Sequence, residues 1–322
     1  DGDLDLFVGG RQVPGKYGMI PKSYLLKNEG GKFKDFTNDL AEGLQAIGMV
    51  TTSLWMDYDG DQDEDLILAG EWMQLTCFEN NDGKLTNNSK KVGFENTEGW
   101  WNKLVSVDLD QDGDQDLIAG NLGLNIKYKA TEDQPFTLYI KDFDNNGTHD
   151  VYLGYYEDGV CYPIRGRECS SQQMPFIKEE FKDYDKFGKA TLDEILGARK
   201  EGAEYRTVKM FASSFIENKG DGHFELHKLP NEAQISPIFG IETSDLNGDG
   251  NLDILIGGNY YNREIETTRS DAGIGQILLG NGKNEFVAMP SAETGLALYK
   301  DVRAIEILNK NSNHPTIIVA NN

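Results

Sequence analysis

The sequence predicts an all-β fold, a β-propeller of four-stranded blades with a small helical insertion. Three observations support this prediction. A nine-residue acidic motif recurs along the chain, and an apolar strand follows each copy. A second pattern, two short strands joined by a turn rich in Asn, Asp and Gly, recurs farther along in several repeats. The 322 residues include 36 glycines, and 38% are hydrophobic, which favours a turn-rich β architecture with a real core.

The acidic motif offers oxygen ligands for a hard cation. Side-chain oxygens stand at positions 1, 3, 5 and 9, and a backbone carbonyl is available at position 7. Calcium fits best because it takes six to eight oxygens at about 2.3–2.6 Å in flexible geometry, whereas magnesium requires a stricter octahedron and is the second choice. The four complete copies predict four calcium sites. The candidate ligands are Asp57, Asp59, Asp61, Asp63 and Asp65; Asp108, Asp110, Asp112, Asp114 and Asp116; Asp142, Asp144, Asn146, Thr148 and Asp150; and Asp245, Asn247, Asp249, Asn251 and Asp253.

A fifth copy is cut by the start of the chain and leaves Asp1 and Asp5 as further candidate ligands. The chain begins inside a repeat without an initiator Met or a signal-peptide pattern, so we interpret it as a fragment of a longer precursor. The segment 302–322 is predicted to be a degenerate copy that forms strands but lacks the carboxylates for an ion. About five blades, whole or partial, are therefore represented, and a seven-bladed parent is compatible with this number.

The charge distribution agrees with bound cations. The formal net charge is −23, and 20 of the 54 acidic residues lie in the five motif copies. Like charges at this density are costly unless counter-ions neutralise them. A strongly negative chain without a basic stripe repels phosphate, so nucleic acid is excluded as a partner. No stretch reaches the roughly 18 apolar residues that a membrane-spanning helix needs.

Each acidic motif is expected to join two strands as a hairpin. With the second hairpin, a unit of roughly 50 residues then describes one four-stranded blade. The strands expected before the motif cover residues 52–56, 104–107, 136–141 and 239–244, and those after it cover 66–70, 117–120, 151–154 and 254–258.

The strand pattern stops over residues 171–203, where we predict a helical insertion within a single propeller domain spanning 1–322. Pro175 suits a first helical turn, and Thr191 and Glu194 match a capping box. Two short helices are expected, and packing against the propeller is favoured over a part in a ligand site. Three large side chains at helical spacing define the expected buried face: Ile177, Phe181 and Tyr184.

The motif is not an EF-hand, because the bidentate Glu required at position 12 is replaced by an apolar residue in every copy. An Asp-x-Asp/Asn-x-Asp/Asn-Gly-x-x-Asp loop before an apolar strand resembles the FG-GAP/VCBS repeat of integrin-like β-propellers. Segments 121–125, 139–144, 162–167 and 173–178 are similar to parts of VCBS-repeat proteins of the Bacteroidetes ASPIC/UnbV-associated type. This resemblance implies an exported protein that is at the cell surface, outer membrane-associated or secreted.

One copy departs from the family pattern. The loop that starts at Asp57 has Gly60 at position 4 and Gln62 at position 6, where the other copies have Gly. We therefore expect a distorted turn or a more weakly bound ion in this loop.

Outside the loops, no catalytic constellation of good specificity is found, and none of the four histidines has metal-ligand spacing. Arg165, Arg167 and Glu168 are interpreted as a salt-bridge clamp for the insertion, with an acidic ligand as the alternative. The pairs Trp100-Trp101 and Tyr260-Tyr261 are either a sugar-stacking platform or, as favoured, partly core. Among the three cysteines, pairing of Cys161 with Cys169 and buried free thiols both remain open.

The leading functional hypothesis is a non-catalytic, calcium-binding extracellular β-propeller that serves as a binding or adhesion module for a protein or glycan ligand. Its basis is the repeated cation motif together with the lack of a catalytic set. The alternative is a carbohydrate-active enzyme, a polysaccharide lyase or hydrolase, on the same calcium-stabilised scaffold, because fold alone does not decide function.

Overall fold

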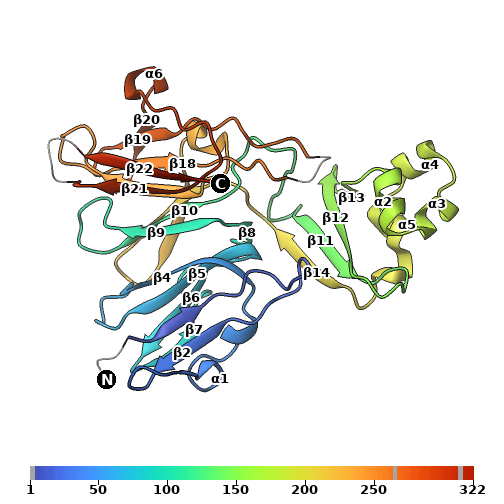
Figure 1. Ribbon diagram of the computed structural model, residues 1–322, viewed down its shortest axis with the longest axis horizontal. Helices are drawn as coiled ribbons and strands as arrows, with labels where there is room; N and C mark the ends of the chain where they lie inside the picture. The colour runs from blue at the N-terminus through green and yellow to red at the C-terminus, as the bar shows by residue number, and fades with distance from the viewer. Residues whose placement is uncertain (1–3, 264–266, 311–314) are drawn as a thin grey trace.

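The computed structural model describes residues 4–263, 267–310 and 315–322, and most of these residues lie in antiparallel sheets. In Figure 1 five sheets form a stack, with the first strands of the chain at the bottom and the last at the top. A sixth sheet, with four of the helices, lies at the right of the stack and is called the lateral unit here. The predicted all-β, propeller-like fold is confirmed.

The first two sheets follow the order of the chain. The first is the three-stranded sheet β1-β2-β3, and the second has the order β4-β5-β6-β7, with β8 also paired to β5. The elements are β1 (Leu6–Val8), β2 (Tyr24–Asn28), β3 (Phe33–Asp35), α1 (Thr37–Leu40), η1 (Leu44–Ala46), β4 (Met49–Met56), β5 (Asp65–Met73), β6 (Thr76–Asn81), β7 (Lys84–Asn87) and β8 (Gly99–Trp100).

The third sheet is assembled from two distant parts of the chain. Its order is β16-β15-β10-β9, so β10 and β15 are neighbours although residues 121–213 separate them in sequence. The fourth sheet, β17-β18-β19-β20, and the fifth, β21-β22, again follow chain order. The elements are β9 (Lys103–Val107), β10 (Asp116–Gly120), β15 (Ser214–Asn218), β16 (Phe224–Lys228), η3 (Asn231–Gln234), β17 (Gly240–Ser244), β18 (Asp253–Gly257), β19 (Gln276–Gly280), β20 (Phe286–Ala288), α6 (Ser291–Thr294), β21 (Val302–Leu308) and β22 (Thr316–Asn321).

The lateral unit interrupts the third sheet between β10 and β15. Its four-stranded sheet has the order β13-β12-β11-β14 and carries short helices on one side. The acidic motif at residues 142–150 therefore lies in the lateral sheet and not in a blade of the stack. The elements are β11 (Phe136–Lys141), β12 (Asp150–Glu157), β13 (Val160–Pro163), α2 (Arg167–Gln173), α3 (Phe176–Glu180), α4 (Tyr184–Lys189), α5 (Leu192–Leu196), η2 (Gly197–Lys200) and β14 (Glu204–Val208).

The helices of the lateral unit are shorter and more numerous than the two expected. The Thr191–Glu194 capping box is present at the start of α5, as the sequence indicates. The predicted buried face is wrong at Tyr184, which is 63% exposed. Its other two members, Ile177 and Phe181, are buried. The reason is that α3 ends at Glu180 and a new helix begins at Tyr184, so the helical phase is not continuous.

Apolar clusters fill the space between successive sheets. Leu104, Leu117 and Ile216 of the third sheet pack with Ile67 and Ala69 of β5 in one cluster. Similar clusters join the first sheet to the second, the third to the fourth and the fourth to the fifth. The burial of apolar surface between blades is thus what holds the stack together.

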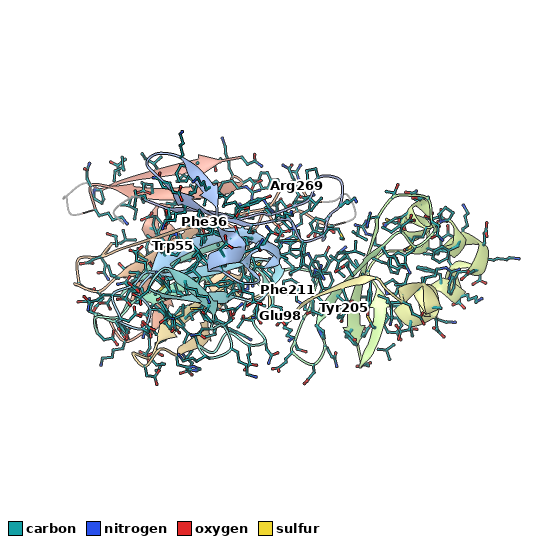
Figure 2. All side chains as sticks on the ribbon, turned by 90° about the horizontal axis from the view of Figure 1, so that it is seen from below. Phe36, Trp55, Glu98, Tyr205, Phe211 and Arg269 are labelled. Atoms are coloured by element: carbon teal, nitrogen blue, oxygen red, sulfur yellow. The ribbon has the colours of Figure 1, made fainter. Side chains whose placement is uncertain are left out.

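A further cluster joins the lateral unit to the second sheet. Phe136, Leu138 and Val208 of the lateral strands pack with Trp72 and Phe211. Figure 2 shows Tyr205 on the lateral sheet and Phe211 toward the stack, where the chain crosses back to β15.

Candidate metal-binding loops

The four acidic motifs form the loops β4–β5, β9–β10, β11–β12 and β17–β18, so the predicted hairpins are present. We refer to them as loops 1 to 4 in chain order. In each of three loops, one carboxylate oxygen from each of three aspartates lies within 4.8 Å of the others. The sets are Asp57, Asp59 and Asp61; Asp108, Asp110 and Asp112; and Asp142, Asp144 and Asp150. Loop 4 has Asn247 at position 3, where its Nδ2 donates to Asp249 Oδ2 at 2.9 Å.

All four loops have the same backbone conformation. Position 4 is left-handed in every loop, with φ between 59° and 81°. Position 6 is left-handed as well, and there Gln62 has φ 76° where the other loops have glycine. The position 6 N–H donates to the aspartate at position 1 at 2.8–3.2 Å in all four loops. The expected distortion of loop 1 is therefore wrong, because Gln62 takes the left-handed conformation despite its side chain.

The aspartate at position 9 anchors each loop to the sheet. Asp65, Asp116, Asp150 and Asp253 are buried and accept a hydrogen bond from the N–H of position 2 at 2.8–3.2 Å. Three of them also accept from the backbone N–H of the third strand of the blade, at Asn80, Asn218 and Gly280 respectively. Each of these carboxylates thus holds its loop against two strands and retains lone pairs for a cation.

The truncated fifth copy shows the same anchoring. Asp5 Oδ1 accepts a hydrogen bond from the backbone N–H of Asn28 at 2.8 Å, like the contact that position 9 makes in loops 1, 2 and 4. Asp1 lies outside the described residues, so its predicted role as a ligand stays a prediction.

Burial and mutual repulsion make several loop carboxylates hard to ionise. Burial raises the pKa of Asp116 to about 7 and that of Asp65 to about 6. Burial, followed by the charge of Asp112, raises the pKa of Asp114 to about 6. A divalent cation would offset both effects, because it supplies positive charge to the ionised form.

Loop 2 contains buried oxygens with unused bonding capacity. Asp108 Oδ1 and Asp114 Oδ1 are buried and have no hydrogen-bond partner among the described residues. Asp108 Oδ2, in contrast, accepts from the Gly113 N–H at 3.2 Å. Buried carboxylate oxygens without donors are costly, and a calcium ion is the type of partner that accepts several such oxygens. The residues of loop 2 therefore fit a calcium ion.

The other position 7 side chains make contacts of their own. Asp63 Oδ2 accepts from the Asp82 N–H at 3.3 Å, and Asn251 Nδ2 donates to Asp249 Oδ1 at 3.0 Å. Thr148, at position 7 of loop 3, donates its backbone N–H to Asn146 Oδ1 at 2.8 Å.

Loops 1, 2 and 4 lie beside one another on the stack. Asn218 Nδ2, at the end of β15, donates to the Tyr58 carbonyl in loop 1 at 2.9 Å. Gln111 Nε2 of loop 2 donates to the Gly250 carbonyl of loop 4 at 2.9 Å. Asn284, from the β19–β20 turn, donates to Asp110 Oδ2 at 2.9 Å. Ions in these loops would therefore lock neighbouring blades together, whereas loop 3 belongs to the separate lateral sheet.

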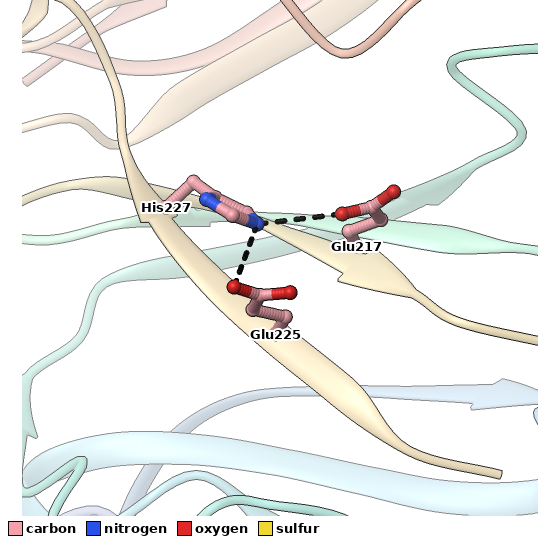
Figure 3. A group of neighbouring side chains, drawn as sticks. All are labelled: Glu217, Glu225 and His227. Atoms are coloured by element: carbon pink, nitrogen blue, oxygen red, sulfur yellow. Dashed lines mark ion pairs between the residues drawn. The ribbon is translucent and has the colours of Figure 1, made fainter.

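The structure brings together a polar cluster that sequence spacing did not reveal. Glu217, Glu225 and His227 converge on neighbouring strands β15 and β16 (Figure 3). His227 Nε2 lies 3.4 Å from Glu217 and 3.9 Å from Glu225. However, Lys219 Nζ already contacts Glu217 at 3.0 Å, so one of the two glutamate charges is compensated. Glu217 and Glu225 are cross-strand partners, and this pairing is the signal that would identify the cluster. It cannot be read from the sequence without the register of the two strands.

Two members of the polar cluster of the lateral unit, Arg167 and Glu168, form the favoured clamp, whereas Arg165 lines a cavity. Arg167 is buried and donates to the carbonyl oxygens of Phe181, Lys178 and Lys182, and to Glu168 at 2.9 Å. These contacts tie α2 to the end of α3 and to the segment before α4.

The two aromatic pairs and the three cysteines take the following positions in the structure. Trp101 is fully buried core, whereas Trp100 is half-buried and packs on Trp72 with ring centroids 5.3 Å apart. Tyr260 and Tyr261 are both half-buried. Cys77, Cys161 and Cys169 are free cysteines in the structure.

Comparison with known proteins bears on the repeat itself. Residues 57–119, which contain loops 1 and 2 and the strands between them, match the model of the FG-GAP-like repeat. No curated protein gives a significant match to the chain. Among the described residues, none of the helices has the length and apolar character needed to cross a membrane. The chain thus contains an FG-GAP-like repeat, a propeller-forming unit, at residues 57–119.

Proposed function

We propose that the chain is a non-catalytic, calcium-binding β-propeller that acts as an extracellular binding or adhesion module. The observation that carries the proposal is the geometry of the loops. Four loops share one backbone conformation, and in loop 2 two buried carboxylate oxygens lack any donor among the described residues. Magnesium remains the second choice, because clustered carboxylates in flexible loops suit the larger ion better.

Calcium would act as a structural ion in this proposal. It binds the folded loops and not the unfolded chain, so its binding free energy adds to the free energy of unfolding. The ligand, a protein or a glycan, would bind elsewhere on the propeller at the cell surface. Export fits the proposal because calcium sites of the weaker class, with Kd about 10⁻⁴–10⁻³ M, occur in extracellular modules.

The test is a direct count of bound ions. Purified protein, stripped with EDTA and dialysed against calcium, is expected to bind about four ions per chain by elemental analysis, with magnesium binding more weakly by calorimetry. The reference is the same protein kept metal-free. If the calcium-treated protein contains no more metal than this reference, the proposal is wrong.

The alternative is a polysaccharide lyase or hydrolase on the same scaffold. Incubation with a panel of acidic and neutral polysaccharides, followed by analysis of released oligosaccharides, separates the two. Product release that one point substitution abolishes would favour the enzyme.

A further inference from the structure

A cavity of about 330 Å³ lies where the second sheet, the lateral sheet and the loop after β18 meet. This volume is within the range of about 300–1,000 Å³ typical of small-molecule sites. Asp65 of loop 1 is the first residue of β5, whereas Glu71, in the cavity wall, is near its last. The cavity and the metal loop therefore lie at opposite ends of the same strand.

The described part of the cavity wall contains more basic than acidic side chains, although the chain as a whole is acidic. Among the described lining residues, Arg11, Arg165 and Arg263 carry positive charge and Glu71 is the single carboxylate. Glu71 is 4% exposed; it accepts hydrogen bonds from Arg11 and, at 3.1 Å, from the Tyr17 hydroxyl. The Glu71 carboxylate is thus already engaged by Arg11 and Tyr17 within the wall.

Arg263 provides the strongest indication of a ligand. Its Nε and Nη2 atoms are buried and have no hydrogen-bond partner among the described residues. The guanidinium lies 5.4 Å from the ring centroid of Tyr260, and burial lowers its pKa. A buried cation without a hydrogen-bonded counter-charge is unfavourable, and a carboxylate would satisfy both nitrogens with the two-pronged geometry that guanidinium prefers.

Aromatic side chains form another part of the wall, next to a strained residue. Trp100 lines the cavity and packs on Trp72, which in turn stacks on Phe136 at 5.5 Å. Trp72 has φ 57°, a conformation that a bulky residue rarely adopts. Such strain persists only where the surrounding structure enforces it, and it is concentrated at binding and active sites.

We propose that this cavity binds a small organic anion that carries a carboxylate on a ring. The carboxylate would pair with Arg263, and the ring would lie against Trp100 or Tyr260. The inference rests on the proposed function, because it names the ligand class of the binding module. Loop 1, a proposed calcium site, lies at the other end of β5, so the calcium proposal and the ligand proposal can fail separately. An acidic sugar and an aromatic acid share this chemistry, and the experiment distinguishes them.

The experiment is calorimetric titration of the calcium-loaded chain with four probes: glucuronate, benzoate, glucose and inorganic phosphate. Saturable 1:1 binding of glucuronate identifies an acidic sugar, and that of benzoate an aromatic acid. Either result supports the proposal if glucose and phosphate do not bind. Binding of neither ring carboxylate, or equal binding of glucose or phosphate, overturns it. Calcium binding measured in parallel reports on the proposed function independently.

The matched variants are Arg263→Met and Arg269→Met. Arg269 is an exposed residue of the same loop that does not line the cavity (Figure 2). Arg263→Met is expected to weaken binding at least about tenfold and to leave the ligand-free melting temperature unchanged or higher, because an unpaired buried charge is removed. Arg269→Met is expected to retain binding. A lower ligand-free melting temperature for Arg263→Met, or equal affinities of the two variants, would refute the role of Arg263.

Discussion

Replacing Asp108 by Asn tests the metal interpretation of loop 2 in two opposite directions. Asp108 has one oxygen bonded to the Gly113 N–H and one buried oxygen without a partner among the described residues. An Asn side chain keeps the shape and the first contact but removes one negative charge. We therefore expect Asp108→Asn to make the metal-free protein more stable and to abolish the calcium site.

The magnitudes follow from the geometry. The oxygens of Asp108, Asp110 and Asp112 lie within 4.8 Å of one another. At such separations each like-charge pair costs roughly 1–3 kcal/mol between the dielectric limits of water and a protein surface. A calcium ion present at a hundred times its Kd contributes about 2.7 kcal/mol. With about 2 °C per kcal/mol for a large chain, the variant should lose about 5 °C of the calcium-induced rise in melting temperature.

The assay is differential scanning calorimetry with calcium and with EDTA, combined with native mass spectrometry to count ions. Asp133→Asn is the matched control, because Asp133 is exposed, lies outside the loops and gives the same change in net charge. The control should keep every ion and the full response to calcium. An Asp108→Asn protein that binds as many ions as the wild type would contradict the role of Asp108 as a ligand. A metal-free form less stable than the wild type would contradict the charge repulsion in loop 2.

Three further predictions concern the backbone, the pH and the clamp. Gln62→Gly should stabilise the protein by up to about 1 kcal/mol in urea unfolding, because glycine takes the left-handed φ at position 6 without a side-chain penalty. The metal-free melting temperature should fall as the pH rises from about 4 to about 7, since folded Asp65 and Asp116 have raised pKa values of about 6 and about 7 and favour folding only while protonated. Calcium at the proposed sites would bind the deprotonated loops, so adding calcium should reverse this trend. Arg167→Met should cost about 3 kcal/mol in urea unfolding, because buried carbonyl oxygens lose a charged donor.

Each of the three predictions has a control variant or an outcome that would contradict it. Gly113→Gln, the reverse exchange at the same position of loop 2, should lower the free energy of unfolding. A less stable Gln62→Gly protein together with a more stable Gly113→Gln protein would contradict the strain assigned to Gln62. A metal-free melting temperature that rises over the same pH range would contradict the raised pKa values. Lys182→Met, at an exposed side chain in the same segment, should change the free energy of unfolding by less than about 0.5 kcal/mol. An equal effect of Lys182→Met and Arg167→Met would show that no clamp exists.

The repeated hairpins could be predicted from sequence because each is local. Each loop is contiguous in sequence with its two flanking strands, and most of its positive-φ positions hold Gly or Asn. The same locality explains the correct capping box at Thr191. The strands predicted within residues 302–322 are confirmed as β21 and β22.

The remaining features depend on contacts between distant segments. Periodicity does not show that β10 pairs with β15 across the lateral unit, so the repeat pattern alone predicts a regular blade around loop 3. The left-handed conformation of Gln62 is imposed by the loop and contradicts the local preference of the residue. The cavity combines residues from Arg11 to Thr267, and no spacing rule connects them.

The way the lateral unit joins the third blade has an evolutionary consequence. The chain leaves at Asn121 and returns at Ser213, and the Asn121 N–H donates to Ser213 Oγ at 2.9 Å. Entry and exit are thus adjacent, so a segment of almost any length can be exchanged at this junction without disturbing the blade. Such an exchange would replace one wall of the cavity and leave the acidic hairpins of the stack intact. Recombination at this junction would therefore change the lining of the cavity while the hairpin framework of the stack is inherited unchanged.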